Sequence, residues 1–160
     1  MVTARGTPVR TLATDRGFTL PEVLIVCAAL AVLLAAGAPH LGDFVRNQRV
    51  KTASFDLFSS LVLARSEAIT RNTRVTVAPA GGAWANGWTI TETGGEVLRR
   101  QEPVPDVTIS GPATVVYVES GRLNAATWPE FQLTASGTGV VQRCIRIDLS
   151  GRPVSKAASC

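Results

Sequence analysis

The segment RGFTLPEVLIV, from Arg16 to Val26, decides the fold because it places one carboxylate, Glu22, at the start of a long apolar run. That run continues to Ala38 without another charged side chain. A helix over the 21 residues from Phe18 to Ala38 would be about 31 Å long, close to the ~30 Å hydrocarbon thickness of a bilayer. An ionised acid in such a span costs at least ~2.5–3.5 kcal/mol, so Glu22 needs a partner. The segment therefore predicts a membrane-spanning helix that contains one acidic residue.

The charges around the apolar run give a weak indication of its orientation. Three arginines and one aspartate precede it, and excess positive charge before a span favours a cytoplasmic N-terminus. Arg46, Arg49 and Lys51 follow the run closely. Charge alone therefore does not decide which end of the span is cytoplasmic.

A secretory signal peptide is an alternative interpretation of the same run. Ala36-Gly37-Ala38 has the A-x-A pattern of a signal peptidase site and follows a basic region. Against this, the apolar run is long for a signal peptide, and Pro39 would directly follow the cut. A third interpretation is a signal-anchored periplasmic β domain, whose N-terminus is either intact or cut after Ala38.

The residues after the apolar run predict a second, amphipathic half of the same helix. The chain has 160 residues, 46% of them hydrophobic and 18% charged, which suits one domain with an appendage. Gly37 and Pro39 separate the two halves, and the proline predicts a kink there rather than the end of the helix. The apolar residues that recur at helical spacing from Leu41 to Thr70 are Leu41, Phe44, Val45, Phe55, Phe58, Leu61, Val62, Ala68 and Ile69.

Beyond Asn72 the sequence changes to short alternating runs separated by Gly, Pro and Asn. Such runs predict antiparallel strands joined by tight turns, and we expect the amphipathic half-helix to cover the apolar face of their sheet. The predicted fold class is thus α+β. The expected strands are Arg74–Ala78, Trp88–Thr91, Val97–Gln101, Val107–Ser110, Thr114–Glu119, Phe131–Thr134 and Val140–Leu149. We expect Trp88 in the core, and Trp84 and Trp128 as exposed contacts.

The three cysteines have different expected roles. Cys27 lies within the apolar run, whereas Cys144 and Cys160 lie in the part that an N-in orientation places outside the cytoplasm. A disulfide between the last two would close a loop of about 17 residues and contribute roughly 3 kcal/mol. The alternative is a pair of free thiols in a reducing compartment.

The opening segment resembles the class III leader of type IV prepilins and type II secretion pseudopilins. The resemblance implies that a prepilin peptidase cuts between Gly17 and Phe18 and methylates the new N-terminus at Phe18. Glu22 becomes the fifth residue of the mature chain, and in this family it pairs with the free amino group of a pilin subunit. Two costly charges would then offset each other in an apolar environment.

A second segment, LARSEAITRNTRVTV from Leu63 to Val77, followed by WANGWTI, resembles the GspH/FimT group of minor pilins and pseudopilins. The resemblance implies a type IV pilin-like fold: a leader at 1–17, a transmembrane or filament-core half-helix at 18–40, an amphipathic half-helix at 41–72 and a β-rich head at 73–160. It implies a single-pass protein of the bacterial inner membrane with its head in the periplasm, which then joins a periplasmic or surface filament. The expected partners are prepilin peptidase, other major and minor pilins or pseudopilins, and the inner membrane.

The sequence contains no motif that favours an enzyme. Its single histidine, His40, follows Pro39 at the expected membrane edge, and we expect an interfacial ring there. The sequence has no catalytic, metal-binding or phosphate-binding motif, and its paired glycines lie between strand-like runs. We therefore expect no enzymatic activity, no cofactor and no small-molecule substrate.

The expected function is that of a minor pilin or pseudopilin that primes or caps filament assembly. The cysteine pair and the arginine-rich C-terminal end favour a type IV pilus, with a pseudopilin of type II secretion as the alternative. A further alternative is DNA binding through Arg143, Arg146, Arg152 and Lys156, since clustered cations neutralise phosphates. DNA-binding members of the FimT branch carry a G-R-x-R motif, whereas this chain has Gly151-Arg152-Pro153-Val154. The second arginine is missing, and Lys156 could replace it in charge only.

Overall fold

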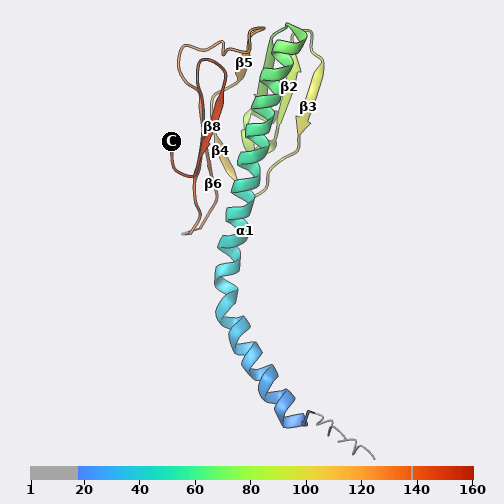
Figure 1. Cartoon of the computed structure of the whole chain (residues 1–160), viewed down its shortest axis with the longest axis vertical. Coiled ribbons are helices and arrows are strands. Elements are labelled where there is room, and N and C mark those ends of the chain that lie inside the picture. The colour runs from blue at the N-terminus through green and yellow to red at the C-terminus, as the bar shows by residue number, and fades with distance from the viewer. Residues whose placement is uncertain (1–17, 138) are drawn as a thin grey trace, which may run out of the picture. The chain divides into compact units, whose positions relative to one another are not determined.

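A computed structural model describes residues 18–137 and 139–160, with backbone only for residues 36–41 (Figure 1). One helix, α1 (Leu20–Arg71), precedes all strands. The strands are β1 (Val75–Pro79), β2 (Trp88–Glu92), β3 (Val97–Gln101), β4 (Thr108–Ser110), β5 (Val115–Tyr117), β6 (Glu130–Thr134), β7 (Arg143–Ile147) and β8 (Pro153–Lys156). Two short 3-10 helices, η1 (Ala80–Gly82) and η2 (Trp84–Asn86), connect β1 to β2. The chain divides after Ala38 into two units, of which the second, Pro39–Cys160, contains all strands and is called the head below.

The backbone of α1 is helical through Gly37 and Pro39, so the proline does not end the helix. The kink expected at these residues stays a prediction. The side chains of residues 36–41, including that of His40, lie outside the described part of the chain. Among the residues that are described, no helix is long and apolar enough to cross a membrane. The predicted span, 18–40, includes five residues whose side chains are not described.

The head contains two antiparallel sheets, where the sequence led us to expect one. The first has the strand order β3-β2-β1-β5 and the second the order β4-β6-β7-β8. The expectation was wrong because β5 pairs with β1 while β4, which precedes it, pairs with β6 in the other sheet. Alternation of polar and apolar residues predicts that a strand exists and which face it buries, but it does not reveal the strand's neighbour.

The buried face of α1 coincides with the predicted stripe only at Leu61 and Ala68. The buried helix residues are Val50, Ala53, Ser54, Leu57, Ser60, Leu61, Ala64 and Ala68. Of the large residues in the predicted stripe, Phe55 and Ile69 are 70% and 50% exposed. Five of the eight buried helix residues are alanine or serine. The sequence interpretation assigned the larger apolar residues to the core and thereby merged two faces of the helix.

The core of the head lies between α1 and the two sheets. Its largest fully buried side chains include Trp88, Tyr117, Phe131 and Leu57, so Trp88 is in the core as predicted. Trp84, predicted to be exposed, is only 3% exposed. Its ring nitrogen donates to the Pro112 carbonyl at 2.8 Å, and its ring meets Phe131 edge-on at 4.8 Å between centroids. The short helix η2 turns this aromatic ring inward, which a turn assignment from sequence does not reveal.

The strand positions agree with the predictions to within a few residues, apart from one omission. The expected strand Val140–Leu149 is shorter in the structure, as β7 occupies only Arg143–Ile147. The last strand, β8, was not predicted, because it is short and begins with a proline. Proline is tolerated at the first position of a strand and at a sheet edge, and β8 satisfies both conditions.

Candidate functional site

Glu22 lies in the first turn of α1, where Glu22 N–H and Val23 N–H both donate to the Thr19 carbonyl. An acidic side chain is favoured at this end of a helix by the helix dipole. Gly17, on the other side of the predicted cut, lies outside the described residues, and Phe18 is 81% exposed. Within the described part of the chain, Glu22 forms no ion pair.

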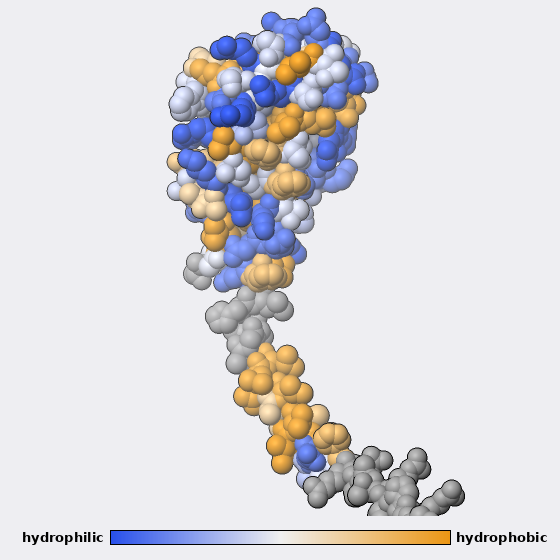
Figure 2. All heavy atoms as spheres, viewed as in Figure 1, coloured by the Kyte–Doolittle hydropathy of each residue, from blue (hydrophilic) through white to orange (hydrophobic). Residues whose placement is uncertain are grey.

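The residues around Glu22 form an apolar surface on all sides of the helix. Every side chain from Phe18 to Ala35 is exposed, and Glu22 is the only carboxylate or cation among them. The face of this segment that is visible in Figure 2 is mostly hydrophobic. The exposed large apolar residues are Phe18, Leu20, Val23, Leu24, Ile25, Val26, Leu30, Val32, Leu33 and Leu34. Water does not favour such a surface, so it needs an apolar environment, as a bilayer or a bundle of neighbouring helices provides.

The four C-terminal cations proposed for DNA binding do not form one surface. In β7 successive side chains point to opposite faces, which separates Arg143 from Arg146. Arg143 lies on the side of α1, in a hollow with Lys51 and Phe55. Arg146 lies on the outer face with Lys156, in a pocket of about 430 Å³ that also contains Trp128.

Two of these four cations already have carboxylate partners. Arg146 contacts Glu130 of β6 at 2.6 Å and lies 5.7 Å above the Trp128 ring, and Arg152 lies 3.7 Å from Asp148. The sequence analysis counted the cations without these acids. The signals that could have revealed them are the antiparallel register of β6 and β7, which places Glu130 opposite Arg146, and the four-residue spacing from Asp148 to Arg152.

Asp148 and Arg152 are joined by a hydrogen bond in the turn before β8. Asp148 Oδ1 accepts the Ser150 hydroxyl at 2.5 Å and the Arg152 N–H at 2.9 Å. These two hydrogen bonds hold the pKa of the Asp148 carboxyl below its usual value, because both favour the ionised form. The bond from the Ser150 hydroxyl has the larger effect, and the bond from the Arg152 N–H has the next largest. The residues of the incomplete G-R-x-R motif thus take part in a hydrogen-bonded turn.

The predicted disulfide between Cys144 and Cys160 is present, with 5.0 Å between the two Cα atoms. It joins β7 to the last residue of the chain. The Cys160 N–H also donates to the Gln132 side-chain oxygen at 2.7 Å. The C-terminal tail is therefore attached to the second sheet through β6 as well as β7. Cys27 is a free, exposed thiol.

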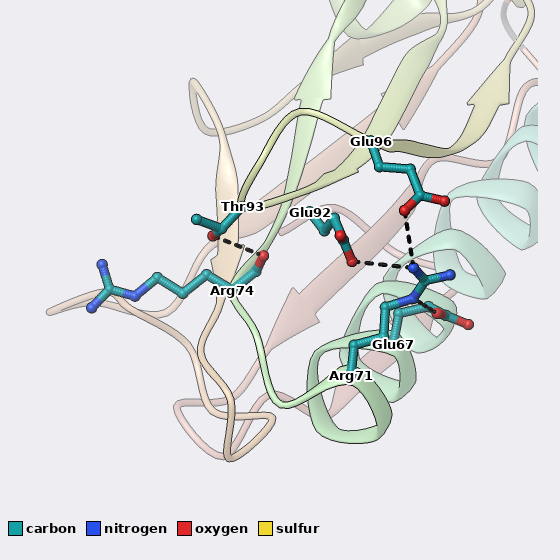
Figure 3. A network of polar contacts seen from close by, with 6 residues as sticks. All are labelled: Glu67, Arg71, Arg74, Glu92, Thr93 and Glu96. Atoms are coloured by element: carbon teal, nitrogen blue, oxygen red, sulfur yellow. Dashed lines mark hydrogen bonds and ion pairs between the residues drawn. The ribbon is translucent and has the colours of Figure 1, made fainter.

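Arg71, at the end of α1, joins the helix to the β2–β3 hairpin (Figure 3). Its guanidinium contacts Glu67 at 2.6 Å, Glu92 at 3.2 Å and Glu96 at 3.3 Å. The hydrogen bond that Arg71 Nε donates to the Glu67 carboxylate is the main reason why the pKa of Arg71 is raised. This network was not anticipated from the sequence, and it anchors the hairpin to the helix. No group of three or more His, Cys, Asp or Glu side chains that could hold a metal ion occurs in the described residues.

Two family models match the chain. The prokaryotic N-terminal methylation motif matches residues 12–38, which include Gly17, Phe18 and Glu22. The model of the type II transport protein GspH matches residues 53–151, more than half of the chain. No curated protein matches the chain in sequence.

Two crystal structures of the type IV minor pilin FimU from Pseudomonas aeruginosa strain PAO1 share the fold. The first, in space group P21, has a TM-score of 0.61 and 21% sequence identity, and the match covers 71% of this chain and 92% of FimU. The second, in space group P65, has a TM-score of 0.58 and 22% identity, with 66% and 91% covered. At this identity the likeness establishes the α+β pilin fold. Together with the methylation motif and the family match, it identifies the chain as a GspH-family minor pilin or pseudopilin with a prepilin leader.

Proposed function

We propose that this protein is a minor subunit of a type IV pilus, cut between Gly17 and Phe18 and N-methylated at Phe18. Before assembly it resides in the inner membrane, with its N-terminus in the cytoplasm and its head in the periplasm. It then enters a filament, where it primes or caps assembly together with other pilins. The exposed apolar helix with its single carboxylate, Glu22, which forms no ion pair within the described residues, is the observation that carries this proposal.

Glu22 is the assembly residue in this proposal. A carboxylate surrounded by aliphatic side chains is tolerated when an amine meets it, and the free N-terminus created at Phe18 on another subunit supplies that amine. The pair would set the axial position of one subunit against the next. Methylation keeps the amine charged, so the pairing survives the modification.

The likeness to FimU supports a pilus over a type II secretion pseudopilus, because FimU is described as a type IV minor pilin. The matching family, in contrast, is named after a type II transport protein. Deleting the gene and restoring it distinguishes the two. Loss of surface pili with normal export of secreted proteins supports the pilus, whereas the reverse phenotype overturns that choice.

The test of processing and assembly uses the full chain expressed in its own bacterium. The mass of the membrane-extracted protein should correspond to a chain that begins with methylated Phe18. Glu22→Ala and Glu22→Gln should both be processed normally yet be strongly depleted from sheared filaments, while Glu102→Ala, an exposed head residue, should enter them as the unaltered chain does. An intact N-terminus, or a cut after Ala38, would refute the proposal, and so would normal incorporation of both Glu22 variants.

A further inference from the structure

The last strand of the second sheet has an open edge. In the order β4-β6-β7-β8, the strand β8 pairs only with β7. Three of its four residues, Val154, Ser155 and Lys156, are exposed. An edge strand presents unpaired N–H and C=O groups, so it can accept a strand from another chain.

The hydrogen-bond pattern identifies the free groups of β8. The Ile147 N–H donates to the Pro129 carbonyl, away from β8, so Ile147 and Pro153 form a non-hydrogen-bonded pair. Hydrogen-bonded and non-hydrogen-bonded pairs alternate along an antiparallel ladder. The pair of Ser155 with Ile145, two positions along, is therefore also a non-hydrogen-bonded pair. The Pro153 carbonyl and both backbone groups of Ser155 consequently point away from β7. They offer three hydrogen-bonding positions to an incoming strand.

An exposed apolar stripe of α1 runs beside this edge. Ser54 Oγ lies 3.3 Å from Ser155 Oγ, which places the helix next to β8, as Figure 1 also shows. Two adjoining hollows, of about 280 and 390 Å³, lie between the helix and the strand and share Phe58. Their apolar lining comes from Phe55, Phe58, Val62 and Ile69, at spacings that keep one helix face. We call these two hollows the α1–β8 groove.

The charged residues that line the α1–β8 groove are all cations. Lys51 and Arg143 line the first hollow, and Arg65 and Arg152 line the second. No carboxylate is among the lining residues of either hollow. Lys51 and Arg143 form no ion pair within the described part of the chain, and the Arg152 contact with Asp148 is long, at 3.7 Å. The groove thus combines a free strand edge, an apolar floor and, at Lys51 and Arg143, positive charge with no ion-pair partner among the described residues.

We propose that the α1–β8 groove binds an extended acidic segment of a neighbouring protein, which adds a strand to β8. Its backbone would pair with Pro153 and Ser155. Its apolar side chains would cover Phe55 and Val62, and its carboxylates would meet Lys51 and Arg143. The inference rests on the proposed function in one respect, namely that the neighbour is another pilin subunit. It specifies a partner strand whose groove-facing residues, every second one along the strand, include both apolar and acidic side chains.

The test measures binding of a fluorescent peptide to the full chain in detergent. The peptide is blocked at both ends, and every second residue, on the face turned to the groove, is alternately glutamate and valine, with threonine between them. The double variant Lys51→Glu/Arg143→Glu should weaken binding about tenfold, since two surface charge pairs are removed and reversed. Phe55→Ser should weaken it through lost apolar contact. Ser155→Pro should weaken it by removing the outward N–H, which β7 does not use. The matched control is Arg99→Glu/Arg100→Glu on β3, an exposed edge of the other sheet.

Three results would overturn the groove proposal: undetectable binding to the unaltered chain, equal weakening by the control pair, or binding unaffected by Phe55→Ser and Ser155→Pro. Competition with duplex DNA provides a further test. If duplex DNA displaces the peptide and binds more tightly, the cations serve phosphate and the proposal fails. The proposed pilin function is judged separately. Normal filament entry with no peptide binding would overturn only the groove, whereas peptide binding without filament entry would overturn only the function.

Discussion

The side-chain oxygen of Asn47 accepts the backbone N–H of Val141 at 2.7 Å, across 94 positions of sequence. The amide nitrogen of the same residue donates to the Gly139 carbonyl at 2.9 Å. Both the oxygen and the nitrogen of the Asn47 side-chain amide therefore bind the connection between β6 and β7, which attaches this connection to α1. This connection leads into β7, which carries Cys144 and Arg146.

Asn47→Ala should lower the free energy of unfolding by about 1 kcal/mol, since two hydrogen bonds are lost while water reaches the exposed groups they leave. Asn47→Asp retains the acceptor but not the donor, so its loss should be smaller. Urea unfolding followed by circular dichroism measures both. Gln48→Ala, at the neighbouring exposed position, is the control. A loss of equal size in the control would show that the two bonds contribute nothing specific.

Tyr117→Phe should leave the stability unchanged or raise it by about 1 kcal/mol, because a buried hydroxyl without a partner costs free energy. Tyr117 is fully buried, and among the described residues its hydroxyl has no hydrogen-bond partner. Burial also raises the pKa of the Tyr117 hydroxyl well above its usual value. Thermal unfolding is the measurement. Tyr117→Ala, which should lose about 3–5 kcal/mol, serves as the contrast. A marked loss in Tyr117→Phe would mean that the hydroxyl is satisfied.

Asp148→Asn should destabilise the head at neutral pH and cease to do so in acid. The folded-state pKa of Asp148 is lowered from 3.8, chiefly by the Ser150 hydroxyl and then by the Arg152 N–H. A carboxyl with a lowered folded pKa contributes stability above its unfolded pKa, and that contribution is lost as the pH falls below 3.8 through the folded value. Melting curves at pH 7 and at successive acidic values should show the difference between variant and unaltered chain disappear. A difference that persists at the lowest pH would contradict this account.

Loss of the disulfide should destabilise the head by roughly 3 kcal/mol on the chain-entropy model, since Cys144 and Cys160 are separated by 16 residues. The double variant Cys144→Ser/Cys160→Ser tests this by urea unfolding without reductant. Cys27→Ser, which removes the free thiol, is the matched control and should change nothing. Adding reductant should lower the stability of the unaltered chain and leave the double variant unaffected. Equal sensitivity of both proteins to reductant would refute the prediction.

The sequence predicted best those features that depend on residues close together in the chain. The apolar run with Glu22 near its start, the alternating strands and the pair of cysteines are all local patterns. Local patterns are enough to assign a helix, most of the strands and the α+β class, because side-chain periodicity follows from backbone geometry. They also sufficed to recognise the leader and the GspH-like segment.

Tertiary structure alone decided which face of α1 is buried and which charges are compensated. Leu57 lies on the buried face of α1 with several alanines and serines, whereas Phe55 is exposed. The face that a helix buries depends on where the strands pack against it, which the sequence of the helix does not reveal. The partners of Arg146 and Arg71 come from other strands, and sequence spacing does not reveal them. Strand pairing is non-local, so the division into two sheets, the open edge of β8 and the separation of Arg143 from Arg146 became visible only once the chain was folded.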